Sequence, residues 1–116
     1  MAGCTSMPPA TVSLSGQIVL LNGLISKRTA DEFAAIVASH TVRRLVITSG
    51  GGHVAPALDM EELIFAKKID VEVPFICLSS CANYIFPAGN QKYSSNIGLV
   101  GWHGNVTHRI YLPHSG

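Results

Sequence analysis

Two adjacent serines, Ser79 and Ser80, stand where an apolar stretch gives way to a short run of small residues that is typical of a buried helix. A hydroxyl at such a junction lies beside the unpaired N–H groups at the positive end of a helix dipole, and these groups favour negative charge that develops nearby. A protein can hold a nucleophile there. The same position also suits a serine that only caps the helix.

Two other segments could complete this chemistry. Ser49 is followed by three glycines, Gly50 to Gly52, directly after an apolar strand-like run, and such a turn brings backbone N–H groups close to a ligand or a reacting carbonyl oxygen. His103 lies at the end of a predicted later strand and could act as a general base. Together the three segments would supply an oxyanion hole, a nucleophile and a base.

The chain from Ser15 to His103 resembles the proteolytic subunit of Clp protease and its relatives in the Clp/crotonase superfamily, especially the small bacterial Clp-like proteins predicted to be periplasmic. The matching segments are residues 16–25, 45–54, 79–89 and 101–104. This resemblance implies an α/β fold with a twisted, mostly parallel sheet, built from βαβ units with flanking helices. It also implies serine-type hydrolysis of a peptide or protein substrate.

The resemblance places the nucleophile at Ser80. Counting back from Ala88 and Gly89 reproduces the family spacing at Ser80 and misses it by one residue at Ser79. The family usually has an alanine where this chain has Ser79, so Ser79 stays open as the alternative nucleophile.

The resemblance further assigns the general base to His103 and the two N–H donors of the oxyanion hole to Gly52 and Cys81. The family triad has an acid downstream of its histidine, but no Asp or Glu follows Glu72 in this chain. Three explanations are open: the chain is a fragment, a carbonyl or amide orients His103, or the site is degenerate. A dyad without the acid would be slower by orders of magnitude.

The 116 residues fit one domain, and we expect residues 1–10 to be a flexible leader and residues 11–116 to form the Clp/crotonase-like domain. The chain is 47% hydrophobic and only 13% charged, so we expect it to bury surface against copies of itself as a homo-oligomer. The net charge is only +1, and the basic residues occur as scattered pairs. The sequence therefore shows no basic cluster that would indicate binding to nucleic acid.

The first residues offer one link to a membrane. Ala2, Gly3 and Cys4 resemble the end of a bacterial lipoprotein signal, in which Cys4 would carry the lipid. The apolar runs elsewhere are too short to span a bilayer. The predicted location is therefore the bacterial cell envelope or periplasm, with the cytoplasm as the alternative.

Hydrophobic periodicity predicts the elements that must position these residues. A capping box from Thr29 to Glu32 predicts that a helix begins there, and an uninterrupted apolar run predicts a parallel strand that is covered on both faces. Right-handed crossovers would bring the glycine turn and the serines to the same carboxyl edge of the sheet. The predicted helices cover residues 30–39, 53–68 and 82–88, and the predicted strands cover 11–21 (bent or double), 42–48, 71–76, 92–96, 97–102 and 106–112.

Cys77 and Cys81 flank the two serines and allow several roles. They could be an oxidised pair in an exported protein or buried thiols in a cytosolic one, and Cys81 could itself be a nucleophile. These cysteines could bind zinc together with His103, His108 and His114, but their spacing along the chain does not match that of structural zinc sites. We predict no metal and no cofactor.

Two other functions use the same features. A crotonase-like acyl-CoA enzyme would share the oxyanion hole. A non-catalytic assembly or interaction module would keep the fold without a working triad, and the missing acid favours it.

Overall fold

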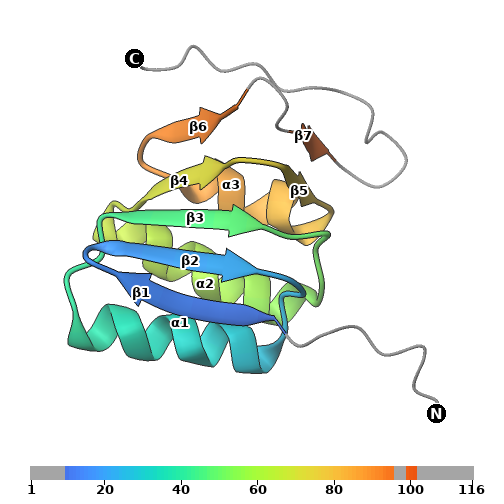
Figure 1. Ribbon diagram of the computed structural model, residues 1–116. Helices are drawn as coiled ribbons and strands as arrows, with labels where there is room; N and C mark the ends of the chain where they lie inside the picture. The colour runs from blue at the N-terminus through green and yellow to red at the C-terminus, as the bar shows by residue number, and fades with distance from the viewer. Residues whose placement is uncertain (1–9, 96–98, 102–116) are drawn as a thin grey trace.

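The computed structural model describes residues 10–95 and 99–101. A five-stranded mixed sheet of order β1-β2-β3-β4-β6 forms the centre, and only its β1–β2 pair is antiparallel (Figure 1). The predicted α/β class, with a mostly parallel sheet and flanking helices, is confirmed. No helix in the described part of the chain has both the length and the apolar composition needed to cross a membrane. The elements are β1 (Thr11–Ser15), β2 (Ile18–Asn22), α1 (Lys27–Ser39), β3 (Arg44–Thr48), α2 (Val54–Lys67), β4 (Asp70–Val73), β5 (Ile76–Leu78), the π-helix η1 (Cys81–Ile85), α3 (Phe86–Ala88), β6 (Lys92–Ser94) and β7 (Leu99–Gly101).

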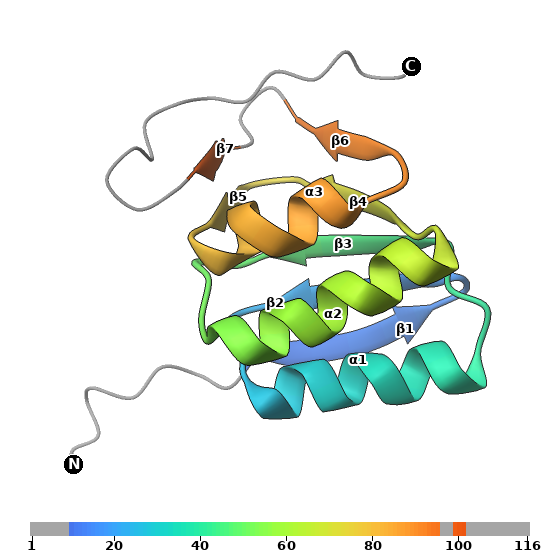
Figure 2. The ribbon, with the colours of Figure 1, turned by 180° about the vertical axis from the view of Figure 1, so that it is seen from behind.

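The helices cover only one face of this sheet, as the two opposite views show (Figures 1 and 2). The crossovers β2-α1-β3 and β3-α2-β4 step in the same direction across the sheet, and right-handed crossovers then place both helices on the same side. Leu45 and Ile47 are fully buried on the helix side, whereas Val46 is only half-buried on the other. Within residues 10–95 and 99–101, helices therefore cover one face of this strand, and not both as the sequence predicts.

Helix α1 begins earlier than the sequence predicts. Its N-cap is Ser26, whose Oγ accepts a hydrogen bond from the N–H of Thr29 at 3.3 Å. Thr29 is buried in the first turn, and its hydroxyl donates to the carbonyl of Leu24 at 2.8 Å. The predicted capping box from Thr29 is thus misplaced by three residues, because Ser26 supplies the capping oxygen one turn earlier.

Removing this cap should measurably destabilise the protein. Ser26→Ala should lower the free energy of unfolding by about 1 kcal/mol, because an N–H in the first turn loses its acceptor. Urea unfolding followed by circular dichroism measures the change. Ser39→Ala, at the exposed far end of the same helix, is the matched control and should change it by less than about 0.5 kcal/mol. Equal effects of the two substitutions would contradict the capping role of Ser26.

The predicted strand over residues 71–76 is split in two by Pro74. Strand β4 ends before it, and β5, which begins after Phe75, pairs with β7 in a second, two-stranded sheet. Proline has no N–H for a sheet ladder, so it ends the pairing within a central strand. The predicted strands over 92–96 and 97–102 correspond to the shorter β6 and β7, and the one over 106–112 lies outside the described residues.

Candidate active site

The glycine turn is attached to the strand that leads to the serines. It follows the end of β3, and Ser49 forms a parallel bridge with Cys77 of β5. The N–H of Ser49 donates to the carbonyl of Ile76, and the N–H of Leu78 donates to the carbonyl of Ser49, both at 3.0 Å. Strand β5 therefore runs beside the start of the turn, which confirms the predicted proximity of the two motifs.

Gly52 lies against the backbone of Ile25. The N–H of Ile25 donates to the carbonyl of Gly51, and the N–H of His53 donates to the carbonyl of Ile25, each at 2.9 Å. These bonds leave the N–H of Gly52 without an acceptor among the described residues. Gly52 has a φ of 154° and is an exposed residue.

Gly51 lies directly against the serine turn. A Cβ on Gly51 would lie 2.7 Å from the Cβ of Ser79 and 2.9 Å from the carbonyl oxygen of Leu78. Only glycine allows this approach, and the φ of Gly51, 110°, also favours glycine. The buried Ser49 hydroxyl fixes the turn from inside, because it accepts a hydrogen bond from the N–H of Gly51 at 3.0 Å.

The two serines differ in backbone and surroundings. Ser79 has a φ of 54°, in the left-handed region, and is half-buried. Ser80 has helical dihedral angles and is 3% exposed, and its Oγ donates to the carbonyl of Gly52 at 3.3 Å. The Ser80 hydroxyl makes no capping hydrogen bond, and the Ser79 hydroxyl makes none to any described residue. Ser80 thus holds the N-cap position of η1, but neither hydroxyl makes a capping hydrogen bond within the described residues.

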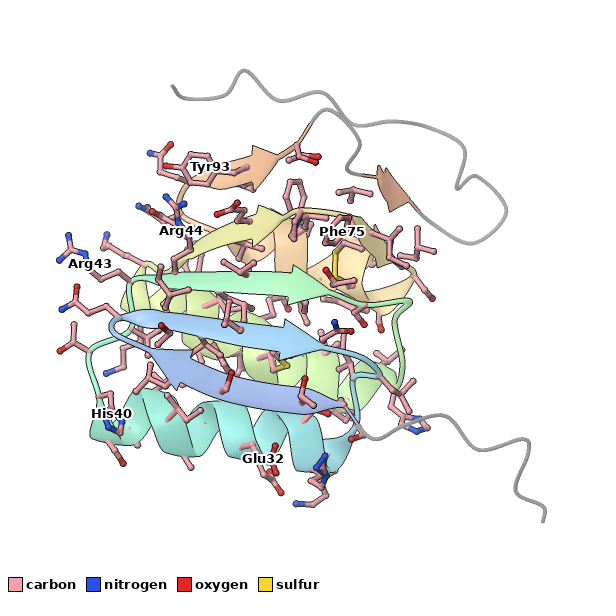
Figure 3. The ribbon with its side chains drawn as sticks, in the orientation of Figure 1. Glu32, His40, Arg43, Arg44, Phe75 and Tyr93 are labelled. Atoms are coloured by element: carbon pink, nitrogen blue, oxygen red, sulfur yellow. A yellow bond between two sulfur atoms is a disulfide. The ribbon has the colours of Figure 1, made fainter. Side chains whose placement is uncertain are left out.

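Cys77 and Cys81 form a disulfide that spans both serines, with 5.2 Å between the two Cα atoms (Figure 3). Both residues are fully buried. The oxidised alternative is thus the one the structure contains, and Cys81 has no free thiol with which to attack a substrate or bind zinc. No group of three or more metal-binding side chains occurs in residues 10–95 and 99–101.

The helix after the serines begins with a π-turn. The N–H of Phe86 bonds to the carbonyl of Cys81, five residues earlier, and α-helical geometry follows only for Phe86–Ala88. Pro87 contributes to this irregularity, because it has no N–H to donate to the carbonyl of Asn83. As a first-turn residue, Cys81 has an N–H that the helical ladder does not use.

The acidic residues nearest to the serines in sequence form hydrogen bonds with other parts of the sheet. Glu72 accepts a hydrogen bond from Arg44 at 2.9 Å, and the Arg44 guanidinium lies over the ring of Tyr93 on the uncovered sheet face (Figure 3). Asp70 accepts the N–H of Gln91 at 3.0 Å. Both carboxylates therefore bond to groups outside the glycine turn and the serine turn.

The predicted base, His103, lies outside the described residues, as do His108 and His114. His53, which the structure does describe, is exposed and precedes the first residue of α2 beside the glycine turn.

Sequence reasoning missed the contribution of two residues to this site. Ile25 holds the glycine turn through its backbone, and the Ser49 hydroxyl bonds within that turn. A backbone contact such as that of Ile25 has no side-chain signature, whereas a serine directly before three glycines was a signal that could have been followed.

The geometry therefore places the glycine turn beside the two serines and the helix start at Cys81, and the N–H of Gly52 has no acceptor among residues 10–95 and 99–101. No model of a known protein family matches this chain, and no curated protein matches it either.

Proposed function

We propose that the protein is a serine-type peptide hydrolase of the Clp/crotonase kind. The observation that carries this proposal is the direct contact between the glycine turn and the serine turn, in which Gly51 touches Ser79 and the Ser80 hydroxyl touches Gly52. A nucleophilic hydroxyl beside unpaired backbone N–H groups is the arrangement that acyl transfer needs.

In the proposed reaction, a serine oxygen attacks the substrate carbonyl carbon. The carbonyl electrons move onto its oxygen, which the N–H groups of Gly52 and Cys81 stabilise. His103 takes the serine proton and gives it to the leaving amine, and water then hydrolyses the acyl-enzyme. The family spacing assigns the attack to Ser80, with Ser79 as the alternative.

The proposal extends to the compartment, the oligomeric state and the substrate of the protein. The Cys77–Cys81 disulfide supports an oxidising compartment such as the periplasm, which agrees with a lipid anchor at Cys4. The low charged fraction supports association of the chain with copies of itself. The substrate would be a peptide or a protein.

A fluorophosphonate probe tests the function without depending on which serine reacts. Wild-type protein should acquire one covalent adduct, seen by intact mass. The double variant Ser79→Ala/Ser80→Ala should acquire none, and His103→Ala should react about 100-fold or more slowly.

Ser39→Ala, on the exposed end of α1, should react like the wild type. A folded wild-type protein that takes no label would refute the hydrolase and favour the non-catalytic module. Binding of an acyl-CoA thioester by such an unlabelled protein would favour the crotonase alternative.

A further inference from the structure

Ser79 has a backbone conformation that its place in the fold does not require. Lys68 has the same φ, 54°, but it ends helix α2, where left-handed residues are common. Ser79 ends no helix, since it lies between β5 and the first helical residue, Ser80. Left-handed non-glycine residues are strained and cluster at functional sites. A sharp strand-to-helix turn of this kind presents a nucleophilic serine in many hydrolases.

The two hydroxyls also differ in availability. Ser80 is 3% exposed, and its hydroxyl proton is directed at the carbonyl of Gly52. Ser79 is half-buried, makes no side-chain hydrogen bond to another described residue, and touches Gly51 of the glycine turn. A reacting hydroxyl has to reach a substrate, and Ser79 is the more exposed of the two serines.

The π-turn weakens the residue count that favours Ser80. Counting back from Gly89 places the nucleophile correctly only where this helix has the same geometry as the helix of the family; in a regular α-helix each N–H bonds four residues back. The bond from Phe86 to Cys81 spans five residues, so the helix holds one residue more than an α-helix with the same number of turns. The count therefore does not decide between Ser80 and Ser79.

From these three observations we infer that Ser79, not Ser80, is the nucleophile of the proposed hydrolase, an inference that rests on the proposed function. The Ser79 Oγ forms the bond to the substrate carbonyl carbon, its proton passes to the base, and the base returns it to the leaving amine. Ser80 is a positioning residue, which holds Gly52 through the hydrogen bond to its carbonyl.

Mapping the fluorophosphonate adduct tests the assignment. In the labelling reaction the serine oxygen bonds to phosphorus, fluoride leaves and the serine proton is released. Trypsin digestion of the reduced, alkylated adduct releases one peptide with both serines, between Lys68 and Lys92. Fragmentation between Ser79 and Ser80 then locates the added mass. We expect it on Ser79.

Ser79→Gly supplies a readout that separates chemistry from folding. It removes the hydroxyl and relieves the left-handed strain, so it should abolish labelling while the Tm stays at or above the wild-type value. Ser80→Ala should keep the adduct on Ser79 but form it several-fold more slowly, because Gly52 loses its partner.

An adduct on Ser80, or labelling that survives in Ser79→Gly and is lost in Ser80→Ala, would overturn the assignment and leave the hydrolase standing. A folded wild-type protein that takes no label would overturn both. The two failures are thus distinguishable.

Discussion

Replacing Gly52 by alanine should lower the free energy of unfolding by about 3 to 5 kcal/mol, combining overpacking with backbone strain. The new Cβ would overlap the carbonyl oxygen of Ile25 and lie 2.7 Å from its nitrogen. Two hydrogen bonds hold these backbone atoms to the same turn, so they cannot move aside as the end of a flexible side chain could. Urea unfolding followed by circular dichroism measures the loss, and an insoluble product agrees with it.

Gly50→Ala is the matched control for this substitution. Gly50 lies in the same turn, but a Cβ there meets no atom within 4 Å. Both changes reduce the entropy of the unfolded chain in the same way, so their difference isolates the collision with Ile25. We expect the control to change the free energy of unfolding by less than about 1 kcal/mol. Equal unfolding midpoints for the two variants would contradict the contact.

The parts of the fold that were predictable are those that depend on hydrophobic periodicity and chain direction. The apolar face of α2 could be read from Met60 and Ile64, both of which are fully buried. The proximity of the glycine turn and the serines follows from right-handed crossovers, whatever the side chains are. The prediction that both faces of β3 are covered failed. Apolar residues such as Val46 also occur on the face that no helix of the described chain covers.

The local geometry of the site was less accessible to sequence reasoning. Pro74 was a visible signal that the strand before the serines is broken, although its consequence, a second sheet, depends on pairing with β7 far along the chain. The π-turn has no signature in composition, since one extra residue in a helix changes no pattern of residue types. A count of residues from Gly89 therefore gave a position for the nucleophile that depends on unseen helix geometry.

Loss of the Cys77–Cys81 disulfide should be the next largest effect. In the chain-entropy account, a bond that closes a loop of about five residues stabilises the folded state by about 2 kcal/mol. The variant Cys77→Ala/Cys81→Ala should show a loss of about that size. Alanine is the suitable replacement, because both positions are fully buried and serine would add hydroxyls that need partners.

A reductant supplies the control for this variant. Dithiothreitol, which reduces the unfolded chain, should lower the urea midpoint of the wild type towards that of the double variant and leave the double variant unchanged. An unchanged wild-type midpoint, with the free thiols confirmed by titration, would contradict a stabilising disulfide.

The same bond also affects the proposed chemistry, because it joins the strand that carries Cys77 to the helix start that presents the N–H of Cys81. Both serines lie inside the closed loop, so reduction should let the serine turn move relative to Gly52. We therefore expect the double variant to react with the fluorophosphonate about tenfold more slowly under conditions where it remains folded. If it reacts at the wild-type rate, the disulfide stabilises the fold without positioning the oxyanion hole, and the contact between Gly51 and Ser79 is sufficient to position the two turns.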